Sequence, residues 1–174
     1  LEAADRESFI ADLQEAFEHF VGDARASFID VSLPEDGTVY PAASPILPRE
    51  DIEESLSRSD AQALRIIEDG TAVGGVILTV EGDRGEIEIL AINASAHGRG
   101  IGARAWTAIE EAYPDVREWE LVTPYFEVRN IHFYVNKCGF HIVEFFNEHH
   151  PAPCAPGMDK DLSFRFVKYV GLPE

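Results

Sequence analysis

Hydrophobic residues recur at a helical spacing in the first part of the chain. Residues 6–21 carry acidic side chains on one face and, three or four positions apart on the other, the apolar residues Phe9, Ile10, Leu13, Phe17, Phe20 and Val21. This pattern predicts an amphipathic helix. Residues 22–48 contain four prolines and predict irregular chain. Residues 48–60 begin with a proline followed by acidic residues, which predicts a short helix.

Short runs rich in β-branched residues replace the helical spacing from Ala61 onward. Residues 61–70, 71–83 and 84–93 form three such runs, separated by the stretches "EDG" and "EGDRG". Glycine and aspartate between apolar runs are typical of tight turns between neighbouring strands. We therefore expect three antiparallel strands connected by hairpins.

The second half of the chain alternates between the two patterns. In order, it predicts a helix over 100–113 that ends before Pro114, a strand over 117–124, a helix over 128–140 closed by Gly139, and strands over 140–148 and 161–170. The whole order predicts a mixed α/β fold. A length of 174 residues fits a single domain over 1–174, in which residues 1–47 form a divergent N-terminal helix and loop.

Charge and cysteine content narrow the function classes. The net charge of −18 argues against nucleic acid, whose phosphates would be repelled. The longest apolar run, residues 71–80, is too short to span a membrane. Two cysteines without a secretory signal at the amino terminus indicate free thiols and a cytoplasmic protein.

The stretch "AHGRGIGARAW", residues 96–106, places three glycines and two arginines between a predicted strand and a predicted helix. Glycines let a ligand approach the backbone, and the amino terminus of a helix offers free N–H groups and a positive dipole to a phosphate. The alternative is a tight connection that only lets the helix pack closely.

Gly98, Gly100 and Ala103 also match the dinucleotide motif G-x-G-x-x-A, and Glu118 or Glu120 could serve as the acidic residue that the motif requires roughly 20 positions later. That motif requires successive parallel βαβ units, which the predicted hairpins exclude.

Two motifs together resemble the GNAT superfamily of N-acetyltransferases. "ILAINASAHGRGIGARAW", residues 89–106, resembles the family's coenzyme A signature Q/R-x-x-G-x-G/A, whose core falls on His97, Gly100 and Gly102. "NIHFYVNKCGF", residues 130–140, resembles the family's second motif. His97 stands where the family usually has Gln or Arg. The resemblance covers residues 48–170 and implies a largely antiparallel sheet with helices on both faces.

In this family the fourth and fifth strands, here 84–93 and 117–124, splay apart to admit the pantetheine arm of acetyl-CoA. The resemblance implies that the backbone of Leu90, Ala91 and Ile92 pairs with that arm, and that Asn130 bonds it from the opposite wall. The pyrophosphate-binding turn would comprise His97, Gly98, Arg99, Gly100, Ile101, Gly102 and Ala103.

Acetyl transfer also needs a proton donor and a proton acceptor. By resemblance, Tyr134 is the general acid that protonates the departing thiolate; the alternative is an aromatic residue of the core. Glu86 and Glu88 alternate with Ile87, Ile89 and Ala91, so we expect both carboxylates on one face of their strand, with Glu88 nearer the splay as the base. A solvated acidic face is the alternative.

Two further stretches could contribute to a site. His149, His150 and Cys154 match no established zinc spacing, so we expect no metal. Tyr125, Phe126 and Glu127 follow the fifth strand and would lie either on the acceptor side of the cleft or in the core.

These observations predict an acetyl-CoA-dependent N-acetyltransferase whose primary-amine acceptor attacks directly in a ternary complex. The alternative is a non-catalytic module that binds or senses acyl-CoA. We expect a small amine or a peptide amine as acceptor, no nucleic-acid or membrane partner, and allow for a homodimer.

Overall fold

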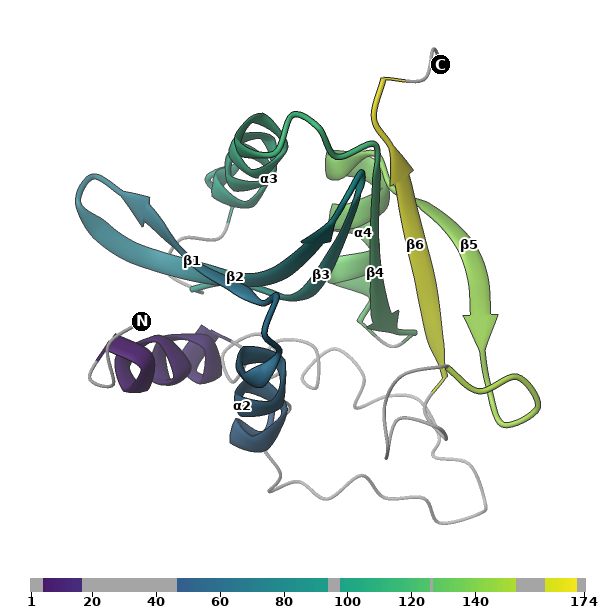
Figure 1. The fold of residues 1–174 in the computed structure, drawn as a ribbon, viewed down its shortest axis with the longest axis horizontal. Helices are drawn as coiled ribbons and strands as arrows, with labels where there is room; N and C mark the ends of the chain where they lie inside the picture. The colour runs from purple at the N-terminus through teal and green to yellow at the C-terminus, as the bar shows by residue number, and fades with distance from the viewer. Residues whose placement is uncertain (1–4, 17–46, 94–97, 126, 153–161, 172–174) are drawn as a thin grey trace.

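The structure is a computed structural model, and it describes residues 5–16, 47–93, 98–125, 127–152 and 162–171. Within these residues one mixed sheet contains β1 (Gln62–Glu68), β2 (Thr71–Glu81), β3 (Arg84–Ile92), β4 (Glu118–Pro124), β5 (His141–Phe146) and β6 (Ser163–Tyr169). The strand order is β1-β2-β3-β4-β6-β5 (Figure 1). Neighbouring strands are antiparallel except β3 and β4, which are parallel. The mixed α/β class and the antiparallel β1–β2–β3 meander are confirmed.

The helices agree with the sequence pattern apart from one detail. Residues 5–16 are helical, and the remainder of the helix expected over 6–21 lies outside the described residues. Helices α2 (Arg49–Ser57) and α3 (Ile101–Ala112) match the segments expected at 48–60 and 100–113. The helix expected over 128–140 consists instead of α4 (Val128–Phe133) and a π-helical turn, η2 (Tyr134–Cys138). A π turn adds one residue to a single turn, which hydrophobic spacing does not show.

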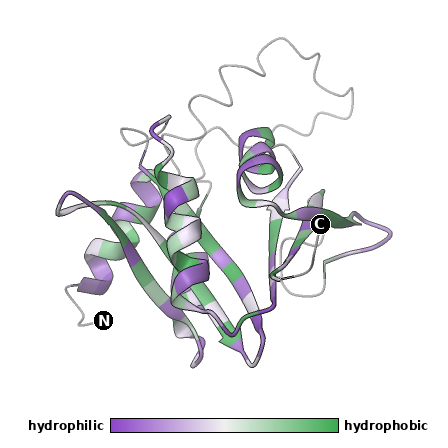
Figure 2. Ribbon diagram, turned by 90° about the horizontal axis from the view of Figure 1, so that it is seen from above, coloured by the Kyte–Doolittle hydropathy of each residue, from purple (hydrophilic) through white to green (hydrophobic). Residues whose placement is uncertain are grey.

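Helices cover both faces of the sheet, and each face has its own core (Figure 1). On one face, Trp106 of α3 and Trp119 of β4 pack edge to face, with ring centroids 5.5 Å apart. On the other, Phe9 of the first helix and Ile52 of α2 pack together. Hydrophobic residues accordingly run along the strands, whereas the helices alternate between hydrophobic and hydrophilic bands (Figure 2). The expected two-sided architecture is therefore present.

Strands β3 and β4 pair over only part of their length. Their pairing runs from Arg84 opposite Glu118 to Ile87 opposite Leu121, although β3 continues to Ile92. The splay expected between these two strands is therefore present. Beyond Ile87, none of the strands that the structure describes lies beside the edge of β3 that faces β4, and such an edge can pair with an extended ligand.

A β-bulge interrupts β3 at the point where the splay begins. Ile87 lies opposite Leu78 and Ile89 opposite Ile77, so Glu88 is an extra residue without its own partner. Because a bulge shifts the alternation of side chains, Ile87 packs in the core beside α3, whereas Ile89 and Ala91 pack against the first helix. The expectation that these three apolar residues share one face is therefore wrong.

Candidate active site

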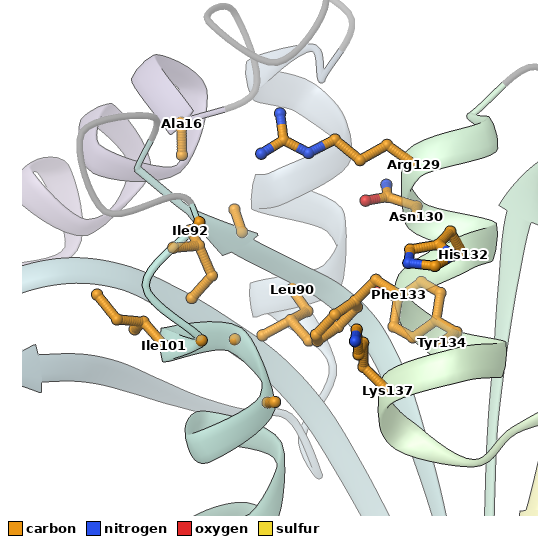
Figure 3. A pocket seen from close by; sticks show the side chains of 15 residues that line it. Ala16, Leu90, Ile92, Ile101, Arg129, Asn130, His132, Phe133, Tyr134 and Lys137 are labelled. Atoms are coloured by element: carbon orange, nitrogen blue, oxygen red, sulfur yellow. The ribbon is translucent and has the colours of Figure 1, made fainter.

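A cavity of about 580 Å³ lies between the splayed end of β3, the start of α3 and the α4–η2 segment (Figure 3). Three groups of expected binding residues line it: Leu90, Ala91 and Ile92 from β3; Gly98, Gly100, Ile101, Gly102 and Ala103 from the glycine turn; and Asn130 and Tyr134 from the facing segment. Ala16, Arg129, His132, Phe133 and Lys137 complete the lining. Residues far apart in the sequence therefore meet around one space, whereas His97 lies outside the described residues.

The glycine turn presents its backbone to this cavity. Gly98 and Gly100 both have left-handed conformations, with φ of 75° and 72°. A Cβ atom added to Gly98 would meet no atom of the described residues within 4 Å, so among these residues nothing blocks a ligand from the backbone there. The N–H of Arg104 bonds the carbonyl of Gly100, 3.1 Å away, which closes the first turn of α3. The preceding N–H groups, from Ile101 to Ala103, lack intrahelical acceptors and suit an anion.

Gly102 is constrained by its neighbour as well as by the turn. A Cβ atom at this position would lie 2.9 Å from the ring of Phe133 on α4. The absent side chain therefore allows α3 and α4 to approach each other beside the cavity.

Tyr134 both lines the cavity and belongs to the core. The residue is 5% exposed, and its ring packs against Phe133, Phe140 and Phe166 at centroid distances of 5.2, 5.8 and 5.9 Å. Burial, and secondarily the charge of Glu127, raise the pKa of its hydroxyl above the ordinary value. The hydroxyl is therefore protonated at neutral pH, as a proton donor must be. The position of Tyr134 is therefore compatible with both interpretations offered by the sequence, a general acid and an aromatic residue of the core.

Glu127 is a buried acid that the sequence left between two interpretations. It is 5% exposed, immediately before α4, and its carboxyl group accepts a hydrogen bond from the side-chain amide of Asn130. Burial raises its pKa to about 7, although the bond from Asn130 opposes this effect. An acid before a helix usually caps it in solvent, so local sequence carries no signal of this burial.

Glu86 and Glu88 do not line the cavity; both bind Arg58, the residue that follows α2. The guanidinium Nη1 lies 3.5 Å from Oε2 of Glu86 and also contacts Oε1 of Glu88. Burial, and then repulsion from Glu86, raise the pKa of Glu88, whereas Arg58 lowers it. The two carboxylates thus share one cation, and Glu88 lies at the bulge beside the splay.

The remaining expected residues lie away from the cavity. The guanidinium of Arg99 turns toward Glu68 of β1, with Nη2 2.7 Å from Oε2. His150 bonds Glu144 at 2.7 Å and stacks on Phe146, whereas Cys154 lies outside the described residues. Among the residues that the structure describes, no three His, Cys, Asp or Glu side chains converge as metal ligands. In the same part of the chain, no helix is long and apolar enough to cross a membrane.

The sequence and the fold both have known relatives. The profile of the acetyltransferase (GNAT) family matches residues 11–140. The uncharacterized protein YrkN of Bacillus subtilis (strain 168) is 39% identical over 178 residues, which cover 96% of this chain and 89% of that protein.

Two solved structures illustrate the likeness of fold. The ribosomal-protein-S18-alanine N-acetyltransferase of Escherichia coli superposes with a TM-score of 0.61 at 12% identity, over 100% of this chain and 93% of that one. A GNAT family acetyltransferase of Elizabethkingia anophelis with acetyl-CoA bound gives 0.57 at 16% identity, over 79% and 95% of the two chains. Since the family profile spans most of the chain, and the sheet splays beside the glycine turn as the resemblance implied, this protein belongs to the GNAT family of acetyltransferases.

Proposed function

We propose that this protein is an N-acetyltransferase that transfers the acetyl group of acetyl-CoA to a primary amine within a ternary complex. The observation that carries the proposal is the meeting of the glycine turn, the unpaired end of β3, Asn130 and Tyr134 around one cavity. The acetyl-CoA bound to the Elizabethkingia anophelis protein supports the same ligand here.

The residues of the cavity fit coenzyme A. The open backbone at Gly98 and the free N–H groups from Ile101 to Ala103 suit the pyrophosphate. The edge of β3 from Leu90 to Ile92, which β4 no longer covers, suits the amide groups of the pantetheine arm. Asn130 on the opposite wall offers a side-chain amide to the same arm. The volume of about 580 Å³ is typical of small-molecule sites.

Each proton in the proposed reaction is assigned to a group of the chain. Acetyl-CoA supplies the activated thioester carbonyl. Glu88 takes a proton from the acceptor ammonium, directly or through water shared with Glu86, and leaves a neutral amine. A backbone N–H near Leu90 or Ala91 stabilises the negative charge that develops on the carbonyl oxygen as the carbon–nitrogen bond forms. Tyr134 protonates the thiolate as the carbon–sulfur bond breaks, and the second proton, which the nitrogen loses as the amide forms, passes through water to restore the Tyr134 hydroxyl.

The acceptor is proposed to be a small amine or a peptide amine. The net charge of −18 and the carboxylates of β3 favour a cationic molecule over nucleic acid. The chemistry above uses no metal, and we propose that the protein acts in the cytoplasm.

Calorimetric titration with acetyl-CoA, followed by measurement of free thiol release over a panel of amines, tests the proposal. We expect binding, and thiol release that depends on one class of amine. Binding without turnover of any amine would favour the non-catalytic module instead. Failure to bind acetyl-CoA would overturn the proposed function.

A further inference from the structure

Glu68, the last residue of β1, binds both arginines of the glycine turn. Its Oε2 lies 2.7 Å from Nη2 of Arg99, and its Oε1 accepts a hydrogen bond from Nη2 of Arg104. The Glu68 side chain is 18% exposed, whereas those of Arg99 and Arg104 are 56% and 61% exposed. One largely buried carboxylate therefore holds two largely exposed cations.

Arg104 also bonds the backbone of the turn itself. Its Nη1 donates a hydrogen bond of 3.0 Å to the carbonyl oxygen of Arg99, and its backbone N–H donates to the carbonyl of Gly100. Two successive carbonyl groups of the turn are thereby oriented toward Arg104. The N–H groups that follow, at the start of α3, have no intrahelical acceptor and remain available to an anion.

From this geometry we infer that Glu68 is a positioning residue for coenzyme A. Through Arg99 and Arg104 it holds the glycine turn in the conformation that presents its N–H groups to the pyrophosphate. The inference rests on the proposed function, because it assumes that this turn binds the pyrophosphate. It also explains the two arginines of the turn as residues that shape the backbone.

The direction in which Glu68→Gln changes the affinity for coenzyme A distinguishes a positioning role from a purely electrostatic one. A carboxylate close to a phosphate site repels the phosphate, so Glu68→Gln would strengthen coenzyme A binding if Glu68 acted through its charge alone. If Glu68 positions the turn, the same change weakens binding, because the ligand must then order the turn itself. Ion pairs with exposed partners contribute little to folding stability, so the variant is expected to fold.

The experiment compares wild type, Glu68→Gln and Glu111→Gln by calorimetric titration with coenzyme A. Glu111, on the exposed last turn of α3, is a matched control that loses the same charge. For Glu68→Gln we expect the Kd of coenzyme A and the KM of acetyl-CoA to rise about three- to tenfold, with kcat within about twofold of wild type. Glu111→Gln should bind as wild type does.

A mutant cycle tests whether Glu68 acts through Arg99 and Arg104. In a background that carries both Arg99→Gln and Arg104→Gln, adding Glu68→Gln should change the Kd by less than about twofold, because both links from Glu68 to the turn are already broken. Hydrogen exchange of the amides from Gly100 to Ala103 should accelerate in Glu68→Gln without ligand. Both results are expected of positioning.

Three outcomes would overturn the inference. Tighter or unchanged coenzyme A binding by Glu68→Gln would contradict the positioning role of Glu68. The proposed function would stand in that case, because wild type still binds coenzyme A. An unchanged exchange rate of the turn amides would contradict the ordering role. Failure of wild type to bind coenzyme A would overturn the proposed function, and this inference with it.

Discussion

The side-chain amide of Asn130 donates a hydrogen bond to the carboxyl group of Glu127, one helical turn earlier. Asn130 lines the cavity, whereas Glu127 is buried behind it. The bond orients the Asn130 amide at the cavity wall and connects the binding surface to an ionisable group in the interior.

Glu127 should make folding stability depend on pH. Its pKa is raised from 4.5 to about 7, so between these values the folded protein keeps the proton that the unfolded chain loses. Stability therefore falls as pH rises through this window, by roughly 3 kcal/mol for this group. Glu127→Gln should remove that part of the slope, as measured by urea unfolding between pH 4.5 and 8. The exposed control Glu111→Gln should keep it, and an unchanged slope in Glu127→Gln would contradict the prediction.

Tyr134→Phe should lower kcat by roughly 10²-fold, the usual contribution of a general acid, because the thiolate loses its proton donor. The ring and its packing remain, so the Kd of acetyl-CoA should not change. Stopped-flow thiol release and calorimetry measure the two quantities. Tyr169→Phe, which removes an exposed hydroxyl on β6, is the control. Wild-type kcat in Tyr134→Phe would leave Tyr134 with a packing role only.

Gly100→Ala should weaken acetyl-CoA binding by roughly tenfold or more, because alanine disfavours the left-handed conformation on which the turn depends. Gly82 in the β2–β3 hairpin is a matched control, since its φ is 62° and an added Cβ meets no atom within 4 Å. Both variants should lose about 1 kcal/mol of stability from backbone strain. Thermal unfolding with and without acetyl-CoA should show the loss of ligand stabilisation in Gly100→Ala alone; an equal loss in both would count against the turn.

Glu88→Gln should depress turnover at neutral pH and recover part of it at alkaline pH, where the acceptor amine deprotonates without help. Glu86→Gln should show the same profile if the two acids share a water, and a smaller loss if Glu86 only sets the local potential. The measurement is a pH–rate profile of kcat/KM for each variant. A profile for Glu88→Gln parallel to wild type would exclude it as the base, and Glu127, Tyr125 and His150 would be tested next.

Local sequence was sufficient for the order of strands and helices and for the glycine turn. Turn residues between β-branched runs predict hairpins because the conformations they require are short-range properties. Gly98 and Gly100 were identifiable for the same reason, since glycine has no Cβ atom and therefore adopts positive φ more readily than other residues. The second motif likewise located Asn130 and Tyr134 on one short segment.

The tertiary structure decided how these pieces meet. The bulge at Glu88 depends on the register between β2 and β3. Because of it, Ile89 and Ala91 lie on the opposite face of the sheet from Ile87, although the sequence predicted one face for all three. The burial of Glu127 and the pairing of Glu68 with Arg99 and Arg104 depend on which elements pack together. Strand register and burial arise from contacts between residues distant along the chain, so no local spacing encodes them. For that reason the sequence alone determined the order of the elements and the glycine turn, and only the packed sheet decided which charged side chains are buried and which are paired.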